Sequence, residues 1–159
     1  MNVQSNNPPA SDATRKVIAG LWIIWGLVHA FAGIITMARD TPDAVAGIAD
    51  DVDESLLVGP YPDAAGAIID QHGWNLMWIG FVTMIAAYFI IRGSWNALGL
   101  AALVGGMADI GYFLFLDLGG HVKFVPGTVM TIFSATAIAL SAWLWSQRRA
   151  EPATSTTVG

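Results

Sequence analysis

Residues 17–38 read VIAGLWIIWGLVHAFAGIITMA, an apolar run whose one titratable side chain is His29. A helix of about 20 apolar residues crosses the hydrocarbon core of a bilayer, so this run has the length of a transmembrane helix. Three further apolar runs of similar length follow, at about 74–91, 95–118 and 124–145. The sequence therefore predicts an all-α integral membrane protein, built as a bundle of four transmembrane helices.

The composition agrees with a chain that folds in lipid. Charged residues make up 12% of the 159 residues and hydrophobic residues 55%, whereas soluble domains carry about 25% charged residues. Seven Lys and Arg residues are too few for a nucleic-acid-binding patch. The chain has no cysteine, which excludes disulfides, thiolate metal sites and iron–sulfur ligation. We expect a multi-pass protein of the cell membrane that does not bind nucleic acid.

Three segments lie outside the apolar runs. Residues 1–16 and 147–159 are mainly polar, and we expect them to form tails around a membrane domain of residues 17–146, the first of them disordered. Residues 39–73 form the one long connection, with eight acidic residues and one basic residue. We expect this connection to be an acidic loop outside the membrane, with a short helix near residues 44–49.

The basic residues near the ends of the runs predict the orientation of the bundle. If the N-terminus is cytoplasmic, five of them lie on the cytoplasmic side: Arg15, Lys16, Arg92, Arg148 and Arg149. Only Arg39 and Lys123 then lie on the outer side. This bias predicts that both termini are cytoplasmic and that the acidic loop faces outward.

The first apolar run has a second interpretation as a secretory signal. Arg15 and Lys16 precede an apolar core, and Ala30-Phe31-Ala32 has the A-x-A pattern of a cleavage site. The run continues past that point to Ala38 and is long enough to span the bilayer. These features favour a retained helix over a cleaved signal.

Asp109 lies deep in the third run, where a carboxylate costs roughly 2.5–3.5 kcal/mol on translocon scales. At 1.5 Å per residue, His29 and Asp109 both lie roughly 18–21 Å from the cytoplasmic surface. Helical spacing puts each on a stripe with neighbours of its own run: Trp22, Gly26 and Gly33 with His29, and Gly105, Tyr112 and Leu116 with Asp109. We therefore expect His29 and Asp109 to face one another inside the bundle.

Hydroxyl groups from the second and fourth runs fall in the same layer. Thr83, Thr131 and Ser134 are expected to bond carbonyl groups of their own helices, as hydroxyls in membrane helices commonly do. A stripe of small residues in the fourth run is expected to allow close helix packing. Its members are Thr128, Thr131, Ala135, Ala139 and Ala142.

A second polar cluster is expected at the outer rim, as a mouth that admits substrate. His72 and Asn75 open the second run, and Asp117 and His121 close the third on the same side. With two tryptophans, the expected substrate contacts are His72, Asn75, Asp117, His121, Trp25 and Trp78. His72 and His121 with Asp70 and Asp117 are also possible ligands of a divalent metal. Their spacing matches no recognised ligand set, so we expect no metal.

The main hypothesis is a small membrane enzyme acting on a lipophilic molecule, of the isomerase, cyclase or hydrolase type. A histidine beside a carboxylate can move protons near neutral pH. Asp109 is expected to be the acid or base, His29 its partner and Tyr112 an orienting group, without a cofactor.

Two alternatives remain open. A haem- or quinone-binding subunit would need two histidines at matching depth, whereas His72 and His121 are expected at the edge and His29 alone below them. A proton-coupled transporter or an assembly subunit would also use an intramembrane acid, and with four spans it would have to oligomerise.

Overall fold

The structure, a computed structural model, describes residues 9–150, and all regular elements in this part of the chain are helical. The elements are α1 Pro9–Ala38, α2 Thr41–Ile48, η1 Glu54–Leu56, α3 Asp63–Ile91, α4 Trp95–Tyr112, η2 Phe113–Asp117, η3 Phe124–Thr128 and α5 Val129–Ala150. Four segments are long and apolar enough to cross a membrane: Asp12–Ala38, Asp63–Ile91, Trp95–Asp117 and Phe124–Arg149. The expectation of an all-helical chain with four apolar spans is confirmed.

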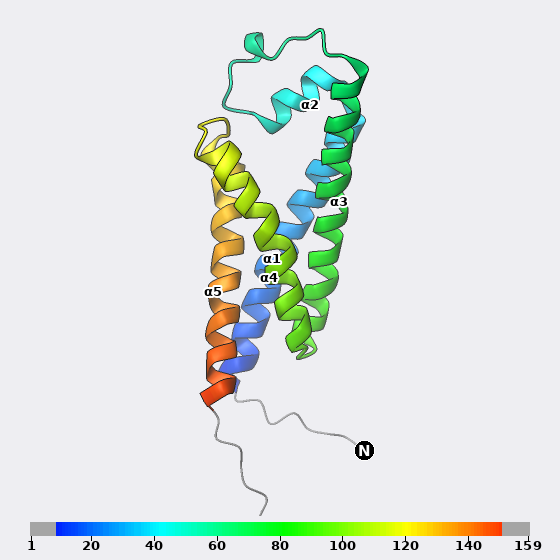
Figure 1. Cartoon of the computed structure of the whole chain (residues 1–159). Helices are drawn as coiled ribbons and strands as arrows, with labels where there is room; N and C mark the ends of the chain where they lie inside the picture. The colour runs from blue at the N-terminus through cyan, green and yellow to red at the C-terminus, as the bar shows by residue number, and fades with distance from the viewer. Residues whose placement is uncertain (1–8, 151–159) are drawn as a thin grey trace, which may run out of the picture.

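The four long helices form a ring in which each packs on two others. Helix α1 packs against α3 and α5, and α4 packs against the same two helices from the other side. Figure 1 shows the start of α1 and the end of α5 at one end of the bundle, here called the terminal end. Helix α2 lies across the opposite end, here called the α2 end.

Two helices begin earlier than the apolar runs indicate. Helix α1 begins at Pro9, so residues 9–16, expected in the tail, are helical. Proline is well tolerated there because the first turn of a helix has no partner for its N–H groups. Helix α3 begins at Asp63, which shortens the predicted 39–73 connection. The rest of the expected tails, residues 1–8 and 151–159, lies outside the described residues.

Glycines let α1 and α3 approach closely. A Cβ atom added to Gly26 would lie 2.7 Å from the carbonyl oxygen of Gly80, and one added to Gly73 would lie 2.9 Å from that of Gly33. Small residues at such contacts bring helix backbones together, and packing of this kind drives helix association in lipid. The burial of Gly26 and Gly33 agrees with the inward stripe predicted for the first run.

Two tryptophans of α1 fill the middle of the bundle. Trp22 and Trp25 are fully buried, and their rings meet edge to face with centroids 5.7 Å apart. The Trp22 ring occupies the space that a side chain at Gly105 of α4 would need. Cleavage after Ala32 would therefore remove the residues at the centre of the core.

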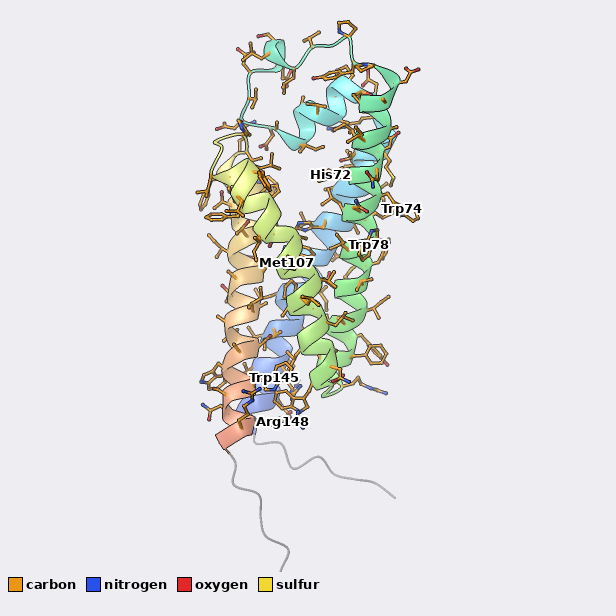
Figure 2. The ribbon with its side chains drawn as sticks, in the orientation of Figure 1. His72, Trp74, Trp78, Met107, Trp145 and Arg148 are labelled. Carbon is orange, nitrogen blue, oxygen red and sulfur yellow. The ribbon has the colours of Figure 1, made fainter. Side chains whose placement is uncertain are left out.

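Two arginines stack on one indole at the terminal end. The guanidinium carbon of Arg15 lies 4.2 Å from the centroid of the Trp95 ring, and that of Arg148 lies 4.8 Å from it. Trp145 packs beside the same ring, and Figure 2 shows Trp145 and Arg148 together at this end. Cation–π contacts of this kind hold charged heads against the aromatic edge of the bundle.

The prediction that the small-residue stripe of the fourth run packs against other helices is wrong for its last three members. Ala135, Ala139 and Ala142 are exposed. The inward face of α5 consists instead of Ser134, Ala137, Ser141 and Leu144, which are all buried. These buried residues recur at three- and four-residue steps on a different face of the same regular helix α5, so the stripe was assigned to the wrong face.

The α2 end is closed by two loops that bond each other. The backbone N–H of Asp51 donates to the carbonyl oxygen of His121 over 3.1 Å. The backbone N–H of Lys123 donates to Oδ1 of Asp50 over 2.7 Å. Helix α2, which confirms the expected short helix, packs against α1 and α3. The acidic connection is therefore a roof over the bundle and is held in place by the α4–α5 connection.

Candidate functional site

His29 of α1 and Asp109 of α4 lie together in the middle of the bundle. Nε2 of His29 is 3.8 Å from Oδ1 of Asp109. The indole N–H of Trp25 donates to Oδ2 of Asp109 over 2.8 Å, and the Trp25 ring stacks on the His29 ring with centroids 3.6 Å apart. One tryptophan thus holds both members of the pair predicted from depth and helical face.

The hydrogen bonds of His29 fix its tautomer. Nδ1 lies 2.8 Å from the carbonyl oxygen of Trp25, which can only accept a hydrogen bond, so Nδ1 carries a proton. In the neutral ring, Nε2 then has a free lone pair, and this is the atom nearest Asp109. The 3.8 Å between Nε2 and the carboxylate is too long for a direct hydrogen bond. The lone pair of Nε2 and the Oδ1 atom of Asp109 are therefore not bonded to each other.

The pair opens into a cavity of about 120 Å³ near the α2 end. Helices α1, α3 and α4 contribute its polar side chains His29, His72, Asp109 and Tyr112. Asp50 of the roof also lines it. The remaining lining residues are Val28, Ala32, Gly47, Ile48, Leu76, Pro126, Gly127 and Met130. A few polar groups on an apolar wall are the usual composition of a small-molecule site.

Tyr112 reaches the cavity because Gly127 leaves room for it. A Cβ atom added to Gly127 would collide with the Tyr112 hydroxyl group and lie 3.4 Å from Val122. Tyr112 stands one helical turn beyond Asp109, so both side chains face the same side of α4. The cavity therefore presents a phenol O–H beside the imidazole–carboxylate pair.

A ladder of hydroxyl groups on α5 runs beside the pair. Ser134 lies beside Asp109 and donates its hydroxyl group to the carbonyl oxygen of Thr131 over 3.0 Å. Thr131 and Thr128 donate to the two oxygens of Asp117 over 3.3 Å and 2.6 Å. The expectation that hydroxyls bond their own helices holds for Ser134 and for Thr83, which donates to Gly80. For Thr131 it is wrong, because its hydroxyl group donates to Asp117 of η2.

Asp117 can face α5 because the end of α4 is wound as a π turn, η2. Eight residues separate Asp117 from Asp109, which in a regular α-helix is about 2.2 turns and leaves the two side chains about 80° apart. The extra residue in a π turn rotates Asp117 back toward the face of Asp109. Turns of this kind occur frequently at functional sites.

No family model, no curated protein and no solved structure matches this chain.

The expected substrate contacts divide into two groups in the structure. His72 lines the cavity, and Trp25 bonds Asp109. Asn75 and Trp78 are not among the residues that line the cavity, and they bond each other, Trp78 Nε1 donating to Asn75 Oδ1 over 3.1 Å. His121 has an exposed side chain and contributes its carbonyl oxygen to the roof. Asp117, as described above, bonds the two threonines.

Several lining residues were absent from the sequence prediction. Asp50 was assigned to a solvated loop, and only the long-range bond to Lys123 places it over the cavity. Leu76, Gly127 and Met130 carry no chemical signal in the sequence. Gly127 could have been found from its position after Pro126, as a small residue facing a bulky one on the neighbouring helix.

The histidines are arranged differently from the prediction. His72 was expected at the edge and His29 alone, but both line the cavity. Figure 2 places His72 on α3 in the half of the bundle nearer α2. The rim residues considered as metal ligands do not converge, since no group of three His, Asp or Glu side chains suited to a metal occurs within residues 9–150.

Proposed function

We propose that this protein is a small membrane enzyme that moves protons on a lipophilic small molecule. The observation that carries the proposal is the free lone pair of His29 Nε2, 3.8 Å from Asp109 inside an apolar cavity. A general acid–base group must lie within hydrogen-bond reach of the proton that it moves. A substrate atom in the cavity beside the pair, about 2.8 Å from both Nε2 and the carboxylate, would satisfy that requirement for both groups at once.

The lining of the cavity favours isomerisation or cyclisation over hydrolysis through a covalent intermediate. Such hydrolysis typically uses a Ser, Thr or Cys nucleophile beside a base. None of these residue types is among the residues of the described chain that line the cavity. Isomerisation and cyclisation need only a proton removed at one position and supplied at another.

Three of the polar side chains that line the cavity have roles in this proton transfer. His29 Nε2 accepts a proton from the substrate, while the bond from Nδ1–H to the Trp25 carbonyl keeps the ring in place. The nearby Asp109 carboxylate stabilises the resulting imidazolium. The proton returns to the substrate at a second position from the same ring or through Asp109. The Tyr112 hydroxyl orients a polar group of the substrate.

The test is substitution of Asp109 by asparagine, which keeps its size and hydrogen bonding and removes the acid. Purified protein in lipid nanodiscs is incubated with a membrane lipid extract and analysed by untargeted chromatography and mass spectrometry. We expect wild type to convert one component, and an isomerised product would keep its mass and change its retention time. Asp109→Asn should slow this conversion by about 100-fold or more, the usual contribution of an acid–base group.

The matched control is Asp70→Asn, a carboxylate that is exposed on α3 and is not among the residues that line the cavity. It should convert the component at the wild-type rate. Conversion by Asp109→Asn at the wild-type rate would refute the acid–base assignment, provided that both variants elute as folded protein in size-exclusion chromatography.

A haem-binding function is the second candidate, because His29 and His72 line one cavity. The visible spectrum of protein purified from haem-replete cells separates it from the enzyme. A Soret band that disappears in both His29→Gln and His72→Gln would support haem ligation. A featureless spectrum together with conversion of a lipid component would support the enzyme.

A further inference from the structure

The two pairs of helices that enclose the cavity separate toward the α2 end. Figure 1 shows α1 beside α3 and α4 beside α5 in this half, with α2 extending across the space between the pairs. Next to this half, the middle of the bundle is closed by Trp22 and Trp25, which are fully buried. The His29–Asp109 pair sits where the open half meets the closed half.

Two lateral hollows adjoin the cavity in the open half. The first, the α3/α4 mouth, has a volume of about 310 Å³ and shares His29, His72, Leu76, Asp109 and Tyr112 with the cavity. The second, the α1/η3 mouth, has a volume of about 290 Å³ and shares Val28, Ala32, Gly47 and Pro126 with it. Because they share these lining residues, the three spaces adjoin one another across the bundle, and together they are here called the passage.

The roof covers the α2 end of the bundle, so the direct way into this passage is through the mouths between the helices. Gly47, Ile48 and Asp50 cover the cavity from the α2 end. The hydrogen bond from Lys123 N–H to Asp50 fixes that cover against the α4–α5 connection. A molecule approaching from water along the bundle axis therefore meets the folded roof, whereas a molecule in the bilayer meets the mouths.

The α3/α4 mouth is the more apolar of the two. The residues that it adds to the cavity are uncharged: Ala108, Gly111, Phe115 and Leu116. The α1/η3 mouth includes Arg39. The face of α4 and η2 beside the α3/α4 mouth is apolar and exposed, with Met107 62% and Phe115 75% accessible. In a bilayer those side chains face lipid tails.

The dimensions favour a thin molecule. The central cavity, at about 120 Å³, is small beside the roughly 300–1,000 Å³ of common ligand pockets. A ring system of drug size exceeds it, whereas an extended hydrocarbon chain can pass through it and leave its ends in the larger mouths.

We propose that the substrate of the His29–Asp109 pair is a long-chain lipid that enters sideways from the bilayer through the α3/α4 mouth. This inference rests on the proposed function for the word substrate, while the route stands on the passage itself. The reacting segment of the chain lies at the centre of the bundle, and the rest of the chain extends between α3 and α4 into the leaflet nearer α2.

Gly111 is the position at which to close the mouth. It lines the α3/α4 mouth, and a Cβ atom added there meets nothing within 4 Å, so a side chain at this position starts in open space. Gly111→Phe is therefore expected to fold and to fill the mouth. Gly20→Phe is the matched control, since a Cβ at Gly20 of α1 also meets nothing within 4 Å and Gly20 is not among the lining residues of the cavity or of either mouth.

The experiment uses a single-chain fatty alcohol with a photoreactive diazirine in mid-chain, incorporated into phosphatidylcholine vesicles that contain the full-length protein. After irradiation, labelled residues are located by peptide mass spectrometry. We expect wild type and Gly20→Phe to be labelled at Leu76 and Met130 inside the passage, and Gly111→Phe to lose that labelling. Labelling of the lipid-exposed Leu103 should be the same in all three proteins.

Interior labelling in Gly111→Phe at the wild-type level would overturn the proposed entrance, as would wild-type labelling confined to exposed residues such as Leu103. If Gly111→Phe does not fold, Leu116→Trp closes the same mouth from η2 and replaces it. Asp109→Asn should keep its interior labelling, because entry needs no acid.

The proposed entrance and the proposed function can be refuted independently of each other. Loss of lipid conversion in Asp109→Asn with unchanged labelling of Gly111→Phe would leave the chemistry standing and refute the route. Labelling that depends on residue 111, without conversion of any lipid by wild type, would leave the route standing and refute the enzyme.

Discussion

Trp25 is the residue that makes a site out of two separate titratable side chains. Its indole N–H donates to Asp109, its ring stacks on the ring of His29, and its carbonyl oxygen accepts from the Nδ1–H of His29. Because all three contacts come from one fully buried residue, the distance and the relative orientation of imidazole and carboxylate are fixed together.

The contribution of Trp25 can be measured against a neighbour of the same kind. Trp22 is also fully buried, but its indole N–H has no acceptor among the described residues. Replacement by phenylalanine costs similar ring volume at both positions, and only at Trp25 does it also leave a buried carboxyl group without its donor. We expect Trp25→Phe to be more destabilising than Trp22→Phe by about 1–3 kcal/mol.

Unfolding in mixed micelles, followed by circular dichroism as the denaturing detergent is increased, gives the two free energies of unfolding. Trp25→Phe should also reduce lipid conversion, whereas Trp22→Phe should not. Equal losses of stability would show that the hydrogen bond to Asp109 contributes nothing beyond packing.

The sequence reveals the His29–Asp109 pair because both residues are rare in apolar runs, and because depth and helical face are countable from a regular helix. It places His72 at the outer rim, because this residue precedes the apolar run of α3, whereas the structure puts it in the wall of the cavity. It does not reveal Asp50, because a bond between segments 73 residues apart places that side chain. The pattern within one regular helix predicts the depth and the face of its side chains. The residues of the roof are placed by contacts between segments that are distant in the sequence.

At the scale of elements, the seam between α1 and α3 sets the spacing of the whole bundle. Gly26 faces Gly80 and Gly33 faces Gly73, so the contacts recur at the same interval along two antiparallel helices. The closeness of these backbones brings His29 and His72 into one cavity, although they come from different helices.

Gly80→Ala tests this seam. A Cβ atom at Gly80 would lie 2.6 Å from the backbone nitrogen of Ala30, which cannot move without moving α1. We expect a loss of about 1–3 kcal/mol in the free energy of unfolding, the usual cost of overpacking. Gly20→Ala adds the same methyl group in open space and should be neutral or stabilising, since alanine is the better helix former. The same micelle titration measures both, and equal stability of the two variants would contradict the role of the seam.

Hydropathy predicts neither the residues at which α1 and α3 begin nor the face of α5 that is buried. Helices α1 and α3 extend beyond their apolar runs, because a helix continues into the polar region wherever its backbone remains bonded. The stripe of α5 was chosen for its small residues, but residue size alone does not tell which face of an apolar helix turns inward, and Ala135 lies on the exposed face.

The whole molecule has two unlike ends. The terminal end is tightly packed, and it carries the stacked Arg15 and Arg148. The α2 end is acidic, hollow and roofed. Of the seven Lys and Arg residues, only Arg39 and Lys123 lie in connections at the α2 end. Basic residues near span ends are retained in the cytoplasm, so this asymmetry favours a cytoplasmic terminal end and an outward-facing roof.

This orientation is testable with cysteines, because the native chain has none and therefore gives no background. Ser55→Cys places an exposed thiol in the roof, and Arg149→Cys places one at the terminal end. In intact cells, a membrane-impermeant maleimide should label Ser55→Cys at once and Arg149→Cys only after permeabilisation. The reverse labelling pattern would show that the roof faces the cytoplasm and the terminal end faces outward. The lateral mouths would then open toward the inner leaflet, and the lipid that reaches His29 and Asp109 would have to be drawn from the cytoplasmic side.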